Sequence, residues 1–147
     1  MYGVICRYVH DRAAAQDLLH DGFITLYTKI GEFRGEGSFE GWCRRIFVNT
    51  ALGYLRRNNP LEGADTEERL AKTGSAEASV IEKMGADDIL KAIDRLPPGY
   101  RTILNLYAVD GYSHREIGQM LGVSENTSRS QYSRARGRLA EILTRNR

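Results

Sequence analysis

Residues 113–139 read SHREIGQMLGVSENTSRSQYSRARGRL, and this stretch has the spacing of a helix-turn-helix. Ser113, followed three residues later by Glu116, forms a capping box, which predicts the start of a helix of about two turns. Gly122 favours the left-handed conformation that ends such a helix. After a short turn, a second helix is expected over residues 125–144.

The second helix, capped by Ser124, carries small polar residues and arginines in its N-terminal half. These side chains can donate to base edges and phosphates, and such a helix fits the major groove of duplex DNA. An antiparallel helix pair with a solvated arginine face would share part of this pattern. The capping box, the glycine turn and the polar helix start together favour DNA binding. The rear face is expected to pack on the first helix through Ala135, Leu139 and Ile142.

Two further helices are predicted before the helix-turn-helix, over residues 86–96 and 98–109. The pair Pro97-Pro98 separates them, because proline ends one helix and suits the first turn of the next. The apolar face of the later helix is expected to consist of Ile103, Leu104, Leu106 and Tyr107.

Three helices are predicted in the N-terminal part of the chain, over residues 2–9, 13–30 and 39–57. Ser38 is a suitable N-cap for the third of them, which follows a glycine-rich break. Pro60 prevents this helix from continuing much further.

Apolar residues at helical spacing predict which helix faces are buried. The helix over 13–30 has a stripe at steps of four, three and four, made of Leu19, Phe23, Leu26 and Ile30. On the following helix, Phe39 and Trp42 could stack on unpaired bases. Their helical step with Ile46 instead favours core packing.

The chain is predicted to be all-α, because no segment with strand periodicity is long enough to form a sheet. Residues 59–85 lack a sustained apolar period and carry six acidic against three basic residues. We interpret them as a flexible acidic linker. It joins two small helical domains, residues 1–58 and 86–147, of which the second contains the helix-turn-helix.

Composition excludes several classes of protein. The chain has 147 residues, 41% hydrophobic and 27% charged, which is typical of a soluble globular protein. It has no apolar run long enough to span a membrane and no secretory signal. Cys6 and Cys43 lie far apart, so a cytoplasmic protein without disulfides or metal is predicted. The histidines are scattered and no P-loop, HExxH or nucleophile motif is present, so neither a cofactor nor enzymatic activity is expected.

The net charge of +2 is unevenly distributed. Residues 1–57 carry eight basic against six acidic residues, and residues 99–147 carry eight against four. Basic ends around an acidic middle indicate contact with a polyanion, although a solvated arginine-rich surface would give the same balance.

Residues 13–57 and 93–139 closely resemble bacterial RNA polymerase sigma factors of the extracytoplasmic-function (ECF) group. The first domain is similar to sigma region 2, which binds core polymerase and melts the downstream promoter element. The second is similar to region 4, which binds the upstream element as duplex. Family members usually have more residues before the position of Tyr2, so the first helix is expected to be short at its start.

The resemblance implies roles for residues of the first domain. The loop that receives an everted base corresponds to Phe33, Arg34, Gly35, Glu36, Gly37 and Ser38. Asn49 corresponds to a base contact in the same element, and Arg56 and Arg57 to phosphate contacts. Docking on core polymerase is implied for Asp17, His20 and Asp21, with a solvated acidic turn as the alternative.

In the second domain, the resemblance implies contacts to the upstream element by Ser128, Arg129, Ser130, Gln131, Ser133, Arg134 and Arg136. Ser128 stands where the family usually has an apolar residue. The implied function is promoter-specific initiation of transcription. The implied partners are core RNA polymerase, promoter DNA and an anti-sigma protein.

Three other hypotheses remain open from the sequence. A stand-alone helix-turn-helix regulator would explain the last fifty or so residues but leave the first domain without a role. A small nuclease would need a metal site that the carboxylates do not suggest. A protein-interaction module would retain docking surfaces without binding DNA.

Overall fold

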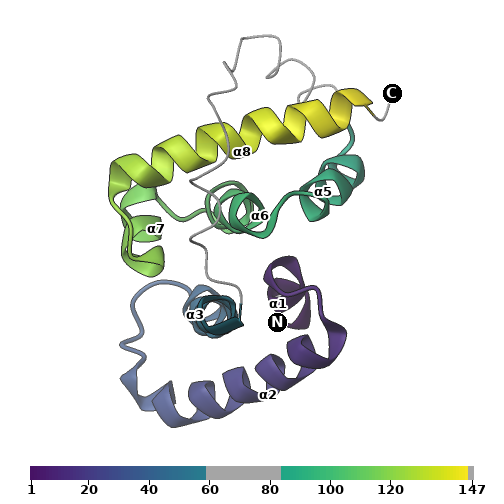
Figure 1. Ribbon diagram of the computed structural model, residues 1–147. Helices are drawn as coiled ribbons and strands as arrows, with labels where there is room; N and C mark the ends of the chain where they lie inside the picture. The colour runs from purple at the N-terminus through teal and green to yellow at the C-terminus, as the bar shows by residue number, and fades with distance from the viewer. Residues whose placement is uncertain (59–83, 146–147) are drawn as a thin grey trace. The chain divides into compact units, whose positions relative to one another are not determined.

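The computed structural model describes residues 1–58 and 84–145, and the chain divides into two compact units, residues 1–60 and 61–147. Every regular element within the described residues is helical, which confirms the all-α prediction (Figure 1). The predicted linker, residues 59–85, lies outside the described residues except for Met84 and Gly85. None of the described helices has the length and apolar character needed to cross a membrane.

The first unit contains α1 (Tyr2–Tyr8), α2 (Arg12–Lys29), η1 (Ile30–Glu32) and α3 (Phe39–Asn58). Two side-chain caps start the longer helices. Asp11 accepts the Ala14 amide at 3.1 Å, and Ser38 accepts the Gly41 amide at 3.1 Å. α1 packs against α2 and α3, which also pack on each other. The buried residues of α1 and α3 include Ile5, Tyr8, Phe47, Val48, Ala51, Leu52 and Leu55.

The apolar stripe predicted for α2 is wrong. Phe23 and Ile30 are 51% and 53% exposed, and Leu19 and Leu26 are only half-buried. The reason is close approach to α3, because a Cβ on Gly22 would overlap the ring of Phe47. Gly22 therefore faces α3, and the Phe23 ring packs edge-on against Phe47, with its centroid 5.1 Å away, while remaining half exposed. The buried face of α2 consists of Ala15, Leu18 and Gly22.

The second unit contains α5 (Ala86–Asp94), α6 (Pro98–Leu104), η3 (Asn105–Val109), α7 (His114–Leu121) and α8 (Glu125–Arg145). The helix predicted over residues 98–109 widens into a π-helical turn at η3. The Asp110 amide closes this turn by donating to the Asn105 carbonyl at 2.8 Å. Gly111 then takes a φ of 78° and ends the helix.

α8 runs along α7, α6 and α5 in turn and holds this unit together (Figure 1). Its inner face buries Ala135 and Leu139 as predicted, but Ile142 is only half-buried and Leu143 is buried in its place. The buried apolar residues before α8 in this unit include Ile93, Leu96, Ile103, Leu104, Leu106, Ile117 and Met120. Tyr107, predicted on the same apolar face, is 38% exposed.

Candidate nucleic-acid interfaces

The helix-turn-helix forms through local bonds that the sequence predicts. The Ser113 hydroxyl accepts the Glu116 amide at 3.1 Å, and the Glu116 carboxylate accepts the Ser113 amide at 2.9 Å. Gly122 ends α7 with a φ of 72°. Gly118 allows the turn to pass closely over α7, because a Cβ there would lie 2.7 Å from the Val123 carbonyl oxygen.

One side of the N-terminal half of α8 is exposed and polar. Its residues follow helical spacing, so their side chains share a face: Asn126, Arg129, Ser130, Ser133 and Arg136. Gln131 and Arg134 are half-buried beside this face. The set offers hydroxyl, amide and guanidinium donors of the kind that read base edges and bind phosphates.

Ser128 does not belong to the exposed face, and its assignment as a DNA contact is corrected. Its side chain is fully buried, and its Oγ lies 2.8 Å from Nδ1 of His114. The helix phase explains the difference, because Ser128 lies on the same side of α8 as the buried residues Ala135 and Leu139.

The glycine-rich loop between η1 and α3 is exposed. Gly35 and Gly37 have φ values of 74° and 75°, conformations that favour glycine, and no atom lies within 4 Å of a Cβ built on either. Arg34 and Glu36 are exposed as well. The Ser38 hydroxyl is already used as the cap of α3. The open part of the loop is therefore Arg34–Gly37.

Three aromatic rings pack together where this loop meets α3. The Phe33 ring lies 5.2 Å from Phe39 and 5.4 Å from Trp42, and Phe39 lies 6.0 Å from Trp42. Core packing, which the sequence favoured, is wrong for Phe39, which is 46% exposed. Trp42 is half-buried. The buried face of α3 carries Cys43 and Phe47, each one residue after a member of the predicted stripe, Trp42 and Ile46. The three rings therefore form a cluster at the surface.

The outer side of α3 carries an amide among arginines. Arg45, Asn49 and Arg56 are exposed at steps of four and seven, which places them on one side of the helix. Arg57 is exposed nearby. Gly53 leaves this side open, since the nearest atom to a Cβ there is the Arg57 guanidinium at 3.6 Å.

The outer side of α2 combines acidic and apolar residues. Asp17, His20 and Asp21 are exposed, and helical spacing continues this face to Ile24 and Tyr27. Ile24 is 57% exposed and Tyr27 is 84% exposed. Clustered exposed apolar side chains of this size are typical of a protein-binding surface.

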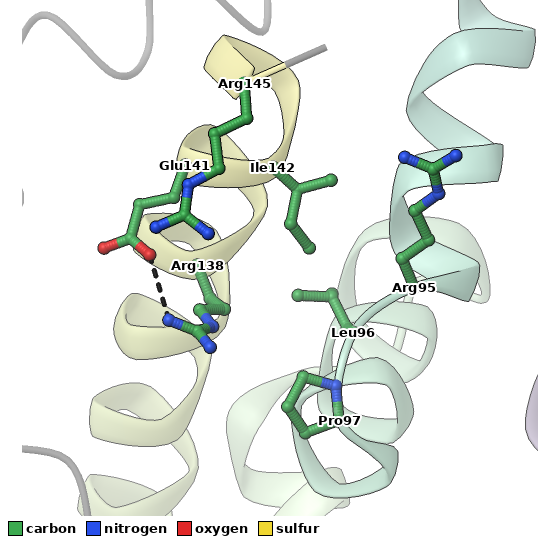
Figure 2. Close-up of a pocket in the computed structure, with 7 residues that line it drawn as sticks. All are labelled: Arg95, Leu96, Pro97, Arg138, Glu141, Ile142 and Arg145. Atoms are coloured by element: carbon green, nitrogen blue, oxygen red, sulfur yellow. Dashed lines mark hydrogen bonds and ion pairs between the residues drawn. The ribbon is translucent and has the colours of Figure 1, made fainter.

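A pocket of about 410 Å³ lies at the C-terminal end of α8 (Figure 2). Arg138, Glu141, Ile142 and Arg145 of α8 line one side, and Arg95, Leu96 and Pro97 line the other. Arg138 and Glu141 form an ion pair at 3.1 Å. The pocket does not include the exposed polar face at the start of α8.

Within the described ranges, no group of three or more His, Cys, Asp or Glu could hold a metal ion.

Comparison with known proteins identifies the family. Residues 1–60 match Sigma-70 region 2, and residues 86–139 match Sigma-70, region 4. Over 96% of its length, the chain is 32% identical to the RNA polymerase sigma-H factor of Pseudomonas aeruginosa, of which it covers 79%. The chain belongs to the sigma-70 family. The resemblance seen in the sequence is thereby confirmed, and one match lies in each unit of this sigma factor.

Two further relatives refine this comparison. The ECF RNA polymerase sigma factor SigM of Mycobacterium tuberculosis is 33% identical over 88% of the chain, which spans 64% of SigM. The sigma factor RpoE of Bartonella quintana, solved in complex with the anti-sigma factor NepR, has a TM-score of 0.61 and 23% identity. The match covers 99% of this chain and 91% of RpoE, and shows that the two share a fold.

Sequence reasoning missed two features of these interfaces. The His114–Ser128 bond joins residues fourteen positions apart, and neither residue alone signals the other. Gly118 could have been recognised from its place in the helix before the turn, where close packing favours a residue without a side chain.

Proposed function

We propose that this sigma factor directs core RNA polymerase to specific promoters by holding two promoter elements, one with each unit. The observation that carries the proposal is the presence, in one chain, of an exposed polar helix-turn-helix face and an exposed glycine loop. Polymerase supplies the catalysis, and this chain supplies the choice of promoter.

In the second unit, the exposed face of α8 binds the upstream element as duplex. Arg129, Ser130, Ser133 and Arg136 are the exposed members of the set that the family resemblance implies. A helix of this polarity reads the major groove through base edges while its arginines bind phosphates. Gln131 and Arg134, half-buried at the edge of the face, take part at the margin of the contact.

In the first unit, the loop Arg34–Gly37 receives one base of the downstream element after it leaves the stack. Everting a base costs a few kcal/mol, so contacts made only by the everted base stabilise the melted state. The positive φ values of Gly35 and Gly37 support a close approach between backbone and base. Asn49 offers an amide to the same element, and Arg56 and Arg57 bind its phosphates.

The outer side of α2 docks on core polymerase. Asp17, His20 and Asp21 supply polar contacts, and the exposed side chains of Ile24 and Tyr27 on the same face support an apolar contact beside them. This combination is typical of an interface with an apolar centre and a polar rim.

An anti-sigma protein is the proposed regulatory partner. The structural similarity to RpoE, which was solved with the anti-sigma factor NepR, supports this proposal. Because polymerase and the chromosome lie in the bacterial cytoplasm, we propose the same location for this chain.

Transcription in vitro with purified core polymerase tests the proposal. Holoenzyme assembled with this chain is expected to give discrete run-off products from a genomic library, and core polymerase alone is expected to give none. A stand-alone regulator would bind DNA but would neither co-purify with core polymerase nor produce these products. Absence of promoter-specific products would contradict the proposal.

A further inference from the structure

Three aromatic rings of the second unit meet beside Arg129 of the exposed face. Tyr107 comes from η3, His114 is the first residue of α7, and Tyr132 lies within α8. The rings of Tyr107 and His114 stack with their centroids 4.2 Å apart and their planes 9° apart. Tyr132 lies 4.5 Å from Tyr107 and 5.5 Å from His114. The cluster therefore joins three elements of the second unit at one point.

The same histidine forms a directional bond to α8. Nδ1 of His114 lies 2.8 Å from Oγ of Ser128, whose side chain is fully excluded from solvent. A neutral imidazole can accept from the hydroxyl or donate to it, depending on its tautomer. In either case the short distance is kept only while the first turn of α7 and the first turns of α8 hold one relative position.

The His114–Ser128 bond constrains the position of α8 relative to α7 more closely than apolar packing does. Burial of apolar surface is non-directional, so the packing of Ile117 and Met120 does not by itself specify one direction for the side chains of α8. A hydrogen bond is sensitive to both distance and angle. Ser128 directly precedes Arg129 and Ser130, so a bond that holds its Oγ also constrains the backbone from which these two exposed side chains extend.

We propose that His114 and Ser128 are positioning residues for the upstream contact, acting through Arg129 and Ser130. The inference rests on the proposed function, because it assigns the exposed face of α8 to promoter DNA. It goes beyond that function by giving this hydrogen-bonded pair a role in recognition in addition to stability.

Four single variants, together with the double variant of the first two, separate positioning from stability. Ser128→Ala removes the hydroxyl, and His114→Phe keeps a stacking ring but removes the nitrogen. His114→Asn removes the ring but places an oxygen near the position of Nδ1. Thr102→Val is the matched control, since Thr102 is a buried hydroxyl of the same unit that donates to the Pro98 carbonyl at 2.7 Å.

The first readout is the affinity of holoenzyme for a promoter fragment recovered by run-off transcription. Ser128→Ala and His114→Phe are each expected to weaken binding by about three- to ten-fold, the effect of one hydrogen bond. The double variant is expected to be no weaker than either single variant, because both remove the same bond. His114→Asn should bind more tightly than His114→Phe. Thr102→Val should lose thermal stability and keep its promoter affinity.

The second readout uses the free chain and does not depend on polymerase. His114→Phe is expected to shift the amide signals of Arg129 and Ser130 in nitrogen-edited NMR spectra, although residue 114 is distant from them in the sequence and reaches α8 through Ser128. Unchanged promoter affinity in Ser128→Ala and His114→Phe would overturn the inference, as would an equal loss in Thr102→Val. Failure of the unmodified holoenzyme to initiate would instead refute the proposed function. In that case, amide shifts of His114→Phe that are confined to α7 would overturn positioning, and shifts at Arg129 and Ser130 would support it.

Discussion

Arg129 and Glu125 form an ion pair on the exposed side of α8, with 2.6 Å between Nη2 and Oε1. Nη1 of Arg129 also donates to Oδ1 of Asn126 at 3.3 Å. The side chains of Arg129 and Glu125 are 57% and 45% exposed, so the pair adds little to stability. Its main effects are to hold the guanidinium in one direction and to place a negative charge beside the proposed DNA contact.

Replacing Glu125 by Gln is expected to increase binding of holoenzyme to DNA that lacks the upstream element. The carboxylate repels phosphates, so its removal should raise this affinity by about five-fold and reduce discrimination between promoter and random DNA. Competition binding at fixed salt measures both quantities. Glu141→Gln is the control, because Glu141 pairs with Arg138 further along the same helix at similar exposure. Equal effects in the two variants would contradict the prediction.

Arg129→Ala should weaken binding to the upstream element by about 1–3 kcal/mol and relax base preference there. Arg138→Ala, in the C-terminal half of α8, should leave base preference unchanged. Affinities for a panel of single-base variants of the promoter, measured at several salt concentrations, provide the comparison. A loss that is uniform across the panel would mean that Arg129 binds only phosphate.

Asn49→Ala should impair promoter melting more than formation of the closed complex. The amide is proposed to contact a base that becomes available only in the melted state, so the loss appears at that step. Permanganate reactivity of unpaired thymines reports melting, and gel shift at low temperature reports closed-complex binding. Asn58→Ala is the control, since Asn58 is exposed on the same helix and its side chain donates to the Tyr54 carbonyl. Equal losses in both assays would exclude the assigned role.

The sequence predicted the helix ends well because local chemistry determines them. Ser113, Glu116 and Gly122 act within one or two turns, and their capping bonds are those expected from their spacing. The proline pair at the start of α6 and Ser38 before α3 are equally local signals. The family resemblance then extended the prediction to function, because segments similar to sigma region 2 and region 4 follow one another in the chain.

The sequence predicted burial less well because burial depends on how helices approach one another. On α2, the larger apolar residues suggested one face, but contact with Phe47 selects the side that carries Gly22. Phe39 has the spacing of a core residue and lies at the surface. Ser128 has the polarity of a DNA contact, but the turn between α7 and α8 brings it beside His114, to which it is hydrogen-bonded.

Gly22→Ala should destabilise the first unit by about 1–3 kcal/mol, because the added methyl group would press on the buried Phe47 ring. Gly53→Ala should have the opposite sign and stabilise the unit by about 0.5–1 kcal/mol, since a Cβ in this helix meets nothing closer than 3.6 Å. Trp42 is the single tryptophan of the chain, so its fluorescence during urea unfolding reports this unit. If both variants changed the free energy of unfolding in the same direction, the packing of α2 on α3 described above would be contradicted.

The stability of the second unit should fall as pH decreases below about 6.5, the ordinary pKa of histidine. Burial, and after it the charge of Arg129, lower the pKa of His114, while Glu125 acts in the opposite direction. The folded unit therefore binds a proton at the His114 imidazole less tightly than the unfolded chain does. The resulting stability is present above pH 6.5 and is lost as the pH falls towards the lower folded-state pKa.

Amide signals of α7 and α8, followed through urea unfolding at pH 7.5 and 5.5, measure this difference. The charged and titratable groups around the imidazole include Arg129, Glu125, Glu116, Tyr112 and the two tyrosines of the ring cluster. His10 and His20 lie in the other unit, so His114→Phe should abolish the pH dependence between these values. If the variant keeps the same dependence, another group titrates. If stability instead rises on acidification, the His114 pKa is raised in the folded unit, because the proton then favours the folded state.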